Sequence, residues 1–218
     1  MPANWTYAHT DGASANEYLI PNPTFKLGLT NRMDLELNIA PVEKVSASGP
    51  LGKQSLTGVS NLIVRTKVNV AGLEGGDFQA AILPYLELPT AKPGIGNKAV
   101  DGGVIVPILF GLPQNFTLVL DPEIDILRNS ANAGRHTNFQ NLVNLSHALS
   151  DSVTGYIELW GQINNDPAGT TKQASLDLAL AWLVWPNLPN LQFDIGTNIG
   201  LTSVTPKVQA YIGVSQRF

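Results

Sequence analysis

Residues 191–201 read LQFDIGTNIGL, and bulky side chains in this stretch alternate with small or polar ones. Phe193 and Ile195 fall on one side, while Asp194 and Gly196 fall on the other. Alternation of this kind predicts a β-strand with one apolar and one polar face. Strands of soluble sheets average about five or six residues. The stretch therefore indicates a fold built from unusually long strands.

The same two-residue period recurs along most of the chain. Residues 62–70 read LIVRTKVNV and residues 174–184 read ASLDLALAWLV, with the same alternation. No window shows the 3.6-residue period of a helix. The pattern predicts twelve strands, near residues 4–9, 17–30, 33–41, 58–72, 77–89, 99–112, 115–128, 135–149, 152–164, 170–185, 190–201 and 206–218.

The connections between these strands alternate in length. Tight turns are expected near residues 31–32, 74–76, 112–114, 150–151 and 186–188. Longer links rich in Gly, Ser, Asn and Pro lie between them, and the longest is expected at residues 42–57. This alternation predicts strands that run up and down, with all tight turns at one end.

Composition excludes several classes of protein. Charged residues make up 14% of the chain, against about 25% in an average soluble protein. The net charge of −4 provides no basic face for nucleic acid. Cysteine is absent, so the chain has no disulfide framework, thiol nucleophile or thiolate metal site. No run of about 18 apolar residues predicts a transmembrane helix.

Twelve strands in an open sheet would leave two exposed edges, so the sheet is expected to close. A soluble barrel or sandwich would have an apolar inside, whereas a transmembrane barrel has an apolar outside and a polar inside. The strand length, the even strand number and the turn alternation favour the membrane. We therefore predict one all-β domain over residues 1–218. It is a transmembrane antiparallel up-and-down barrel of about 12 strands, with short periplasmic turns and longer extracellular loops.

Aromatic residues on the apolar faces support this prediction because they gather beside the tight turns. A soluble core would have no reason to sort its aromatic side chains to one end, whereas a membrane barrel carries aromatic girdles at its interfaces. The expected girdle consists of Phe78, Phe110, Phe116, Trp182, Phe193 and Phe218.

Two stretches and the C-terminus resemble a known family. Residues 27–37 (LGLTNRMDLEL) resemble the hairpin of the outer-membrane family named for the MetA pathway of phenol degradation. Residues 82–90 (ILPYLELPT) resemble that family's proline-rich strand, with Ala91 where Gly is common. The terminal Phe218 is similar to the C-terminal signal of bacterial outer-membrane barrels. The resemblance extends from about residue 17 to Phe218, and it implies an outer-membrane channel or uptake protein for small organic compounds.

The polar strand faces define the expected lining of the lumen. Ten carboxylates and three bases would give this wall a charge of −7. An acidic wall predicts a pore that concentrates cations. Alternatively, the acids pair with bases and water in a closed interior, because twelve strands lie between filled and open barrels. The expected lining is Lys26, Asp34, Glu36, Arg65, Lys67, Tyr85, Glu87, Asp101, Asp121, Glu123, Asp125, Tyr156, Glu158, Trp160, Asp177, Asp194 and Tyr211.

Asp121, Glu123 and Asp125 are spaced to form a row of carboxylates up one strand, about 7 Å apart. They are suited to a cation ladder or a divalent site. If Arg65 and Lys67 face them across the lumen, the two rows would set up a transverse field. Separate salt bridges to neighbouring residues are the equal alternative.

The other candidate residues give little sign of chemistry. The four inward aromatic residues in the lining could stack on a ligand, but filling of the lumen is favoured. Ser146 and His147 are adjacent and point to opposite faces of a strand, so they cannot form a catalytic dyad. No catalytic or phosphate-binding motif is present. We expect no enzyme activity, no catalytic residues, no metal and no cofactor.

The leading hypothesis is a passive channel for small molecules or ions in the bacterial outer membrane. A closed structural or loop-displaying barrel is the alternative, and a soluble all-β binding protein with inverted faces is the third. Expected partners are outer-membrane lipids or detergent, a small solute, and the barrel-assembly machinery through Phe218, but not nucleic acid. No apolar run near the N-terminus could act as a signal peptide. We therefore expect that a signal peptide was removed and that Met1 was added at the start of the mature chain.

Overall fold

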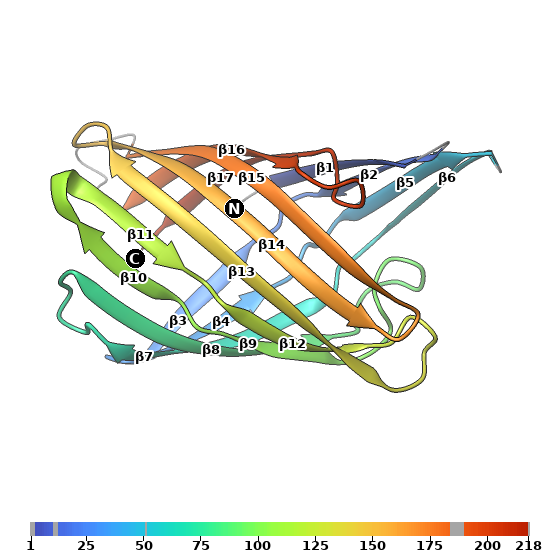
Figure 1. The fold of residues 1–218 in the computed structure, drawn as a ribbon, viewed down its shortest axis with the longest axis horizontal. Helices are drawn as coiled ribbons and strands as arrows, with labels where there is room; N and C mark the ends of the chain where they lie inside the picture. The colour runs from blue at the N-terminus through green and yellow to red at the C-terminus, as the bar shows by residue number, and fades with distance from the viewer. Residues whose placement is uncertain (1–2, 11–12, 51, 184–189, 218) are drawn as a thin grey trace.

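Long antiparallel strands form a single sheet that is rolled into a barrel (Figure 1). The computed structural model describes residues 3–10, 13–50, 52–183 and 190–217. Its seventeen strand segments are β1 (Ala3–Thr10), β2 (Ala13–Leu19), β3 (Thr24–Thr30), β4 (Met33–Asn38), β5 (Glu43–Gly49), β6 (Gly52–Gly58), β7 (Leu62–Ala71), β8 (Phe78–Leu88), β9 (Asp101–Ile105), β10 (Ile108–Leu112), β11 (Phe116–Leu120), β12 (Glu123–Arg128), β13 (Arg135–Ala148), β14 (Val153–Asp166), β15 (Gly169–Leu183), β16 (Leu191–Gly200) and β17 (Val208–Gln216).

The strand pairings close the sheet into a ring. β1 pairs with β17 on one side and with β2 on the other. From β13 to β17 each strand pairs with the next along the chain. At the tight-turn end, β3 pairs with β4 along one edge, and all seven of its residues are exposed. The predicted all-β transmembrane barrel is therefore confirmed as the fold class.

Seventeen segments correspond to twelve wall strands, because five pairs of consecutive segments follow one line each. These pairs are β2–β3, β4–β5, β6–β7, β9–β10 and β11–β12. Proline lies in four of the five breaks, at Pro21, Pro41, Pro107 and Pro122. Proline cannot donate a ladder hydrogen bond, so it interrupts a strand. Other backbone bonds bridge the breaks, such as Asp121 N–H to the Leu142 carbonyl at 2.9 Å.

The prediction of a long loop at residues 42–57 was wrong, because most of this segment forms the hairpin of β5 and β6. Together with β1 and β2, this hairpin extends beyond the rim at the end away from the tight turns (Figure 1). Ser46 and Ser55 share a hydrogen bond of 3.1 Å across it. Small polar residues replace the apolar face here, so the sequence lacks the alternation that marks a membrane strand.

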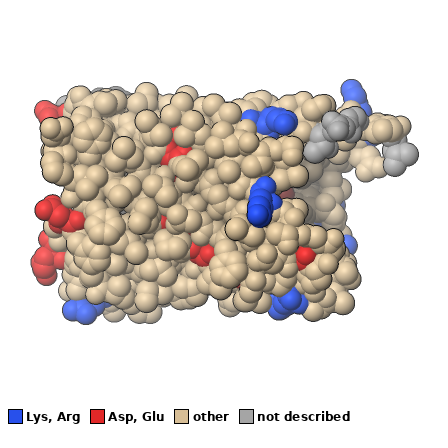
Figure 2. Space-filling view, viewed as in Figure 1, with Lys and Arg blue, Asp and Glu red and all other residues tan. Residues whose placement is uncertain are grey.

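Burial in the barrel is the inverse of burial in a soluble protein. The buried apolar residues of the described chain are three alanines, Ala40, Ala81 and Ala181. Buried polar residues include Asp125 and Asp177, whereas many Leu, Ile, Val and Phe side chains are exposed on the outside. Figure 2 shows this largely uncharged outer face, with charged side chains gathered toward the two ends. Lipid contact accounts for such an apolar exterior.

Helix is nearly absent from the described residues. A short 3-10 turn, η1 (Pro113–Asn115), joins β10 and β11 at the tight-turn end. In the described part of the chain, no helix has the length and apolar character needed to span a bilayer.

Candidate functional site

The inner wall carries a hydrogen-bonded bridge centred on Asp125. Tyr85, Gly103 and Asp125 lie side by side on β8, β9 and β12. The Tyr85 hydroxyl crosses the glycine and donates to Asp125 Oδ1 at 2.7 Å. A Cβ on Gly103 would lie 2.3 Å from Asp125 Oδ1, so only glycine leaves room for the bridge. Asn138 and Gln140 donate to Asp125 Oδ2 at 2.9 and 2.8 Å, and Asp125 is 1% exposed.

A second bridge of the same kind is centred on Asp177. The Tyr211 hydroxyl on β17 crosses Gly196 on β16 and donates to Asp177 Oδ2 on β15 at 2.8 Å. A Cβ on Gly196 would lie 2.3 Å from the tyrosine oxygen. Asp177 Oδ1 is buried and has no hydrogen-bond partner. Glu158 on β14 lies directly opposite Asp177, and Asn144 donates to Glu158 Oε2 at 3.2 Å.

The bases of the inner wall gather on β3 and β7, next to acids of β4. Lys26 Nζ lies 2.6 Å from Glu36 Oε1. Arg65 is the cross-strand neighbour of Glu36, and Lys67 is the cross-strand neighbour of Asp34. The acids of this part of the wall are therefore matched by bases.

The order of strands around the ring places this basic cluster across the lumen from the second bridge. The wall strand that holds β7 is six places from β15 in the ring of twelve, and the one that holds β4 is six places from β14. The row of Asp121, Glu123 and Asp125 does not lie across the lumen from Arg65 and Lys67. Its wall strand is only three places from β7, and Pro122 interrupts it between Asp121 and Glu123. Glu123 interacts electrostatically with Arg65, and Asp121 with Lys67.

Asp101 and Glu87 lie near the loop rim, where they fasten loops. Arg135 Nη1 lies 3.2 Å from Asp101 Oδ1, and the Arg128 backbone N–H donates to the same oxygen at 2.8 Å. Asn61 donates to Glu87 at 2.6 Å. The hydrogen bonds and the ion pair of these two acids hold loops at the rim, so their role is structural.

The remaining residues of the expected lining lie on the same inner face. Tyr156 and Trp160 flank Glu158 at two residues on either side along β14. Trp160 Nε1 donates to Gln140 at 3.2 Å. Asp194 packs over Gly213, where a Cβ would lie 2.2 Å from its Oδ2.

The aromatic residues expected in the girdle contact one another on the outer face near the tight turns. The ring centroids are 5.5 Å apart for Phe78 and Phe110, 5.9 Å for Trp182 and Phe193, and 4.2 Å for Phe116 and His147. Phe218 lies outside the described residues. The role of these rings at a membrane interface stays a prediction.

Sequence reasoning missed two kinds of inner-wall residue. Glu43 interacts with Glu17 and with Glu87, but Glu43 was expected in a loop. The amides that satisfy the acids were also missed, among them Asn138 and Asn144. Their signal was present, because they fall on the same two-residue period as the polar face of β13.

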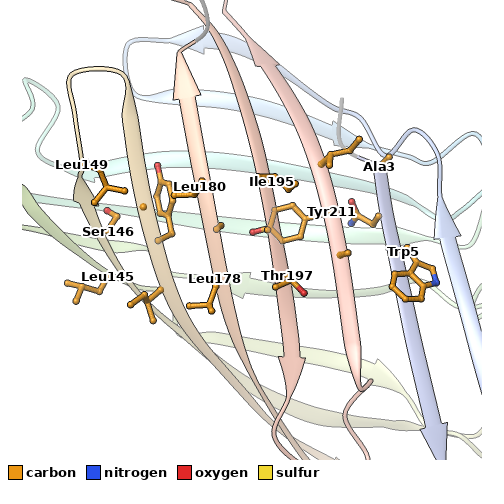
Figure 3. A pocket seen from close by; sticks show the side chains of 18 of the residues that line it. Ala3, Trp5, Leu145, Ser146, Leu149, Leu178, Leu180, Ile195, Thr197 and Tyr211 are labelled. Atoms are coloured by element: carbon orange, nitrogen blue, oxygen red, sulfur yellow. The ribbon is translucent and has the colours of Figure 1, made fainter.

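One cavity of the described residues borders the second bridge, because Gly196 and Tyr211 are among its lining residues. It is an apolar groove of about 900 Å³ over β13–β17 and β1. Figure 3 shows Leu145, Leu178, Leu180 and Ile195 among its lining residues. These four side chains are exposed on the outer face, whereas Tyr156 and Tyr211, which also line the groove, belong to the inner wall.

A family model matches nearly the whole chain. It is described as "Putative MetA-pathway of phenol degradation" and covers residues 5–218. The chain belongs to this family. The resemblance seen in the hairpin and the proline-rich strand is thereby confirmed. No curated protein matches the chain.

Solved structures similar to this family member are outer-membrane proteins. An outer membrane channel from Pseudomonas putida F1 is 14% identical with a TM-score of 0.73, covering 100% of this chain and 94% of the channel. The NanC porin is 8% identical with a TM-score of 0.65, covering 100% and 99%. OmpT of Vibrio cholerae is 9% identical with a TM-score of 0.50, covering 100% and 95%. At these identities the likeness establishes the barrel fold.

Proposed function

We propose that the protein is an outer-membrane channel for passive uptake of small solutes through an acidic, cation-preferring lumen. The observation that supports this most is the inner face of β14, β15 and β16. Glu158, Asp177 and Asp194 lie on it, and the described part of this face holds no Lys or Arg. A barrel with an apolar outside and this inside is suited to hold water and ions.

Charge on the wall favours cations for an electrostatic reason. Carboxylates without nearby bases create a negative potential, and the low-dielectric wall focuses it into the lumen. The opposite wall carries Lys26, Arg65 and Lys67, which are matched by acids. A solute would therefore pass between a negative and a balanced wall, and cations would be concentrated.

Family membership favours organic compounds among the small solutes, because the family's description refers to phenol degradation. Two of the similar solved structures are a channel and a porin, and neither description refers to an enzyme. The same likeness supports a location in the bacterial outer membrane. Phenol itself is neutral at pH 7, so the acidic wall does not select it.

Planar-bilayer recording of detergent-refolded protein tests the proposal. We expect discrete conductance steps. In a salt gradient, we expect a reversal potential whose sign indicates that cations permeate better than anions. Steps with anion preference would overturn the acidic-lumen claim. A folded barrel without steps at any voltage would overturn the channel claim.

A closed, loop-displaying barrel is the second candidate, and the β5–β6 hairpin favours it. This hairpin rises beyond the rim and carries Lys44, Ser46 and Lys53 on its outer side (Figure 1). Deletion of residues 46–54 with a short turn in their place separates the candidates. A channel keeps its conductance after the deletion, whereas a display barrel has no conductance to lose.

A further inference from the structure

Two carboxylates meet on the inner wall without a positive partner. Glu158 and Asp177 are directly opposite each other on β14 and β15. Side chains in this relation have Cβ atoms about 4.5–5.5 Å apart, and like charges there destabilise a sheet. Asp177 is 7% exposed, and its Oδ1 has no hydrogen-bond partner. A buried acceptor left in this state costs free energy, and a donor that carries positive charge would satisfy it and offset the like-charge contact with Glu158.

The surrounding strands do not supply that donor. Within the described residues of β13 to β17, the Lys and Arg residues are Arg135 and Lys172, and both lie near the loop rim. Lys172 is opposite Ile163, which is exposed on the outer face, so it points away from the lumen. Arg135 is held by Asp101. A positively charged donor to Asp177 would therefore reach it from the lumen.

The first bridge shows which kind of group fits. Asp125 has the same tyrosine bridge, but its second oxygen accepts hydrogen bonds from the amide nitrogens of Asn138 and Gln140. At Asp177 the corresponding second oxygen is free. The second oxygen of such a carboxylate is thus satisfied by N–H donors.

The neighbours of Glu158 favour an organic cation. Tyr156 and Trp160 share its inward face, each about 7 Å along the strand. Aromatic faces attract ammonium groups and pack against hydrocarbon. In the part of the chain that the structure describes, no group of three or more His, Asp or Glu side chains is placed to hold a metal ion. The surroundings are those of an ammonium site and not of a chelated metal.

We propose that Glu158 and Asp177 form a binding subsite for the primary ammonium group of a small organic cation. The inference rests on the proposed function, because the solute reaches this subsite through the lumen. The ammonium group donates to Asp177 Oδ1 and to Glu158, while Tyr211 and Asn144 keep the two carboxylates in place. The hydrocarbon part of the solute lies against Tyr156 or Trp160.

Isothermal titration calorimetry on the detergent-folded barrel tests this subsite without requiring conduction. The probe is 2-phenylethylammonium, and 2-phenylethanol is its neutral counterpart. We expect the ammonium to bind and the alcohol to give no heat above dilution. Glu158→Gln and Asp177→Asn should each weaken binding about tenfold or more, as loss of a charged hydrogen bond predicts. Asp194→Asn is the matched control, because it removes the same charge from the same wall, opposite Ala181 and Gly213.

Each result has a definite meaning. Equal binding of ammonium and alcohol, or equal weakening by Asp194→Asn, would overturn the subsite. Displacement of the probe by potassium chloride in the same way at all three variants would show general charge screening and would also overturn it. Glu158→Gln keeps its size and its position beside Asn144, so it serves if Asp177→Asn does not fold. Binding without bilayer conductance would refute the channel and leave the subsite standing, whereas conductance without binding would do the reverse.

Discussion

The two tyrosine bridges share one geometry but differ in how completely their aspartates are hydrogen-bonded. In each, a tyrosine crosses a glycine on the next strand and donates to an aspartate on the strand beyond. Asp125 receives three donors and is 1% exposed. Asp177 receives one donor from Tyr211 and lies opposite another carboxylate. A buried charge that is fully hydrogen-bonded stabilises the wall, whereas one that is half satisfied is available to a ligand.

Replacement of the two aspartates should separate their roles most clearly. Asp125→Ala leaves Tyr85, Asn138 and Gln140 without their acceptor, and we expect it to lower the free energy of unfolding by about 3–5 kcal/mol. Asp177→Ala removes one hydrogen bond and relieves a like-charge contact, so about 1 kcal/mol or less is expected. Urea unfolding in lipid vesicles measures both. Equal losses would contradict the distinction.

The two glycines give a smaller contrast. Alanine at Gly103 would place its Cβ 2.5 Å from the Ile124 carbonyl oxygen, which belongs to the backbone and cannot move aside. We expect Gly103→Ala to cost about 1–3 kcal/mol, as overpacking does. Alanine at Gly196 meets the end of the Tyr211 side chain, which can rotate away. Gly196→Ala should cost less in the same urea unfolding assay. A larger loss at Gly196 would show that the Tyr211 bridge is the rigid one.

Much of this fold was predictable because membrane strands carry a strong two-residue period. The tight turns near residues 31–32, 74–76, 112–114 and 150–151 followed from the same signal, whereas the one expected at 186–188 lies outside the described residues. The β5–β6 hairpin was not predictable, because outside the membrane nothing selects an apolar face at Ser46 or Ser55. The sequence also could not predict which acids accept hydrogen bonds at both oxygens, because that depends on their cross-strand partners. Glu158 and Asp177 lie 19 positions apart in the sequence, and only the register of β14 against β15 sets them opposite each other.

The basic cluster across the lumen offers a finer test of the contrast between walls. Arg65→Gln removes one positive charge that is opposite Glu36. We expect cation preference to rise by less than about twofold, because Lys26 continues to pair with Glu36. Reversal potentials in a salt gradient measure this change. A strong rise would mean that the basic wall, and not the acidic one, sets selectivity.

The smallest effect is expected at the rim, outside the membrane. Asp166 accepts hydrogen bonds from the Ala168 and Ser130 backbone N–H groups at 2.8 and 2.7 Å. These bonds lower the pKa of Asp166 below its ordinary value of 3.8. Because the pKa is lower in the folded state, the stabilisation is present above about pH 4 and is lost as pH falls through the folded value. Asp166→Asn should therefore speed hydrogen exchange at Ser130 a few-fold at pH 7. No change in exchange would contradict the role of this carboxylate.

Glu158 and Asp177, the carboxylates of the second bridge that lack a basic partner, should set the charge preference of the lumen. The most direct test is the reversal potential of the Glu158→Gln, Asp177→Asn double variant against wild type, in one potassium chloride gradient. We expect cation preference to fall several-fold while the barrel stays folded and conducting. A double variant with the reversal potential of wild type would contradict it.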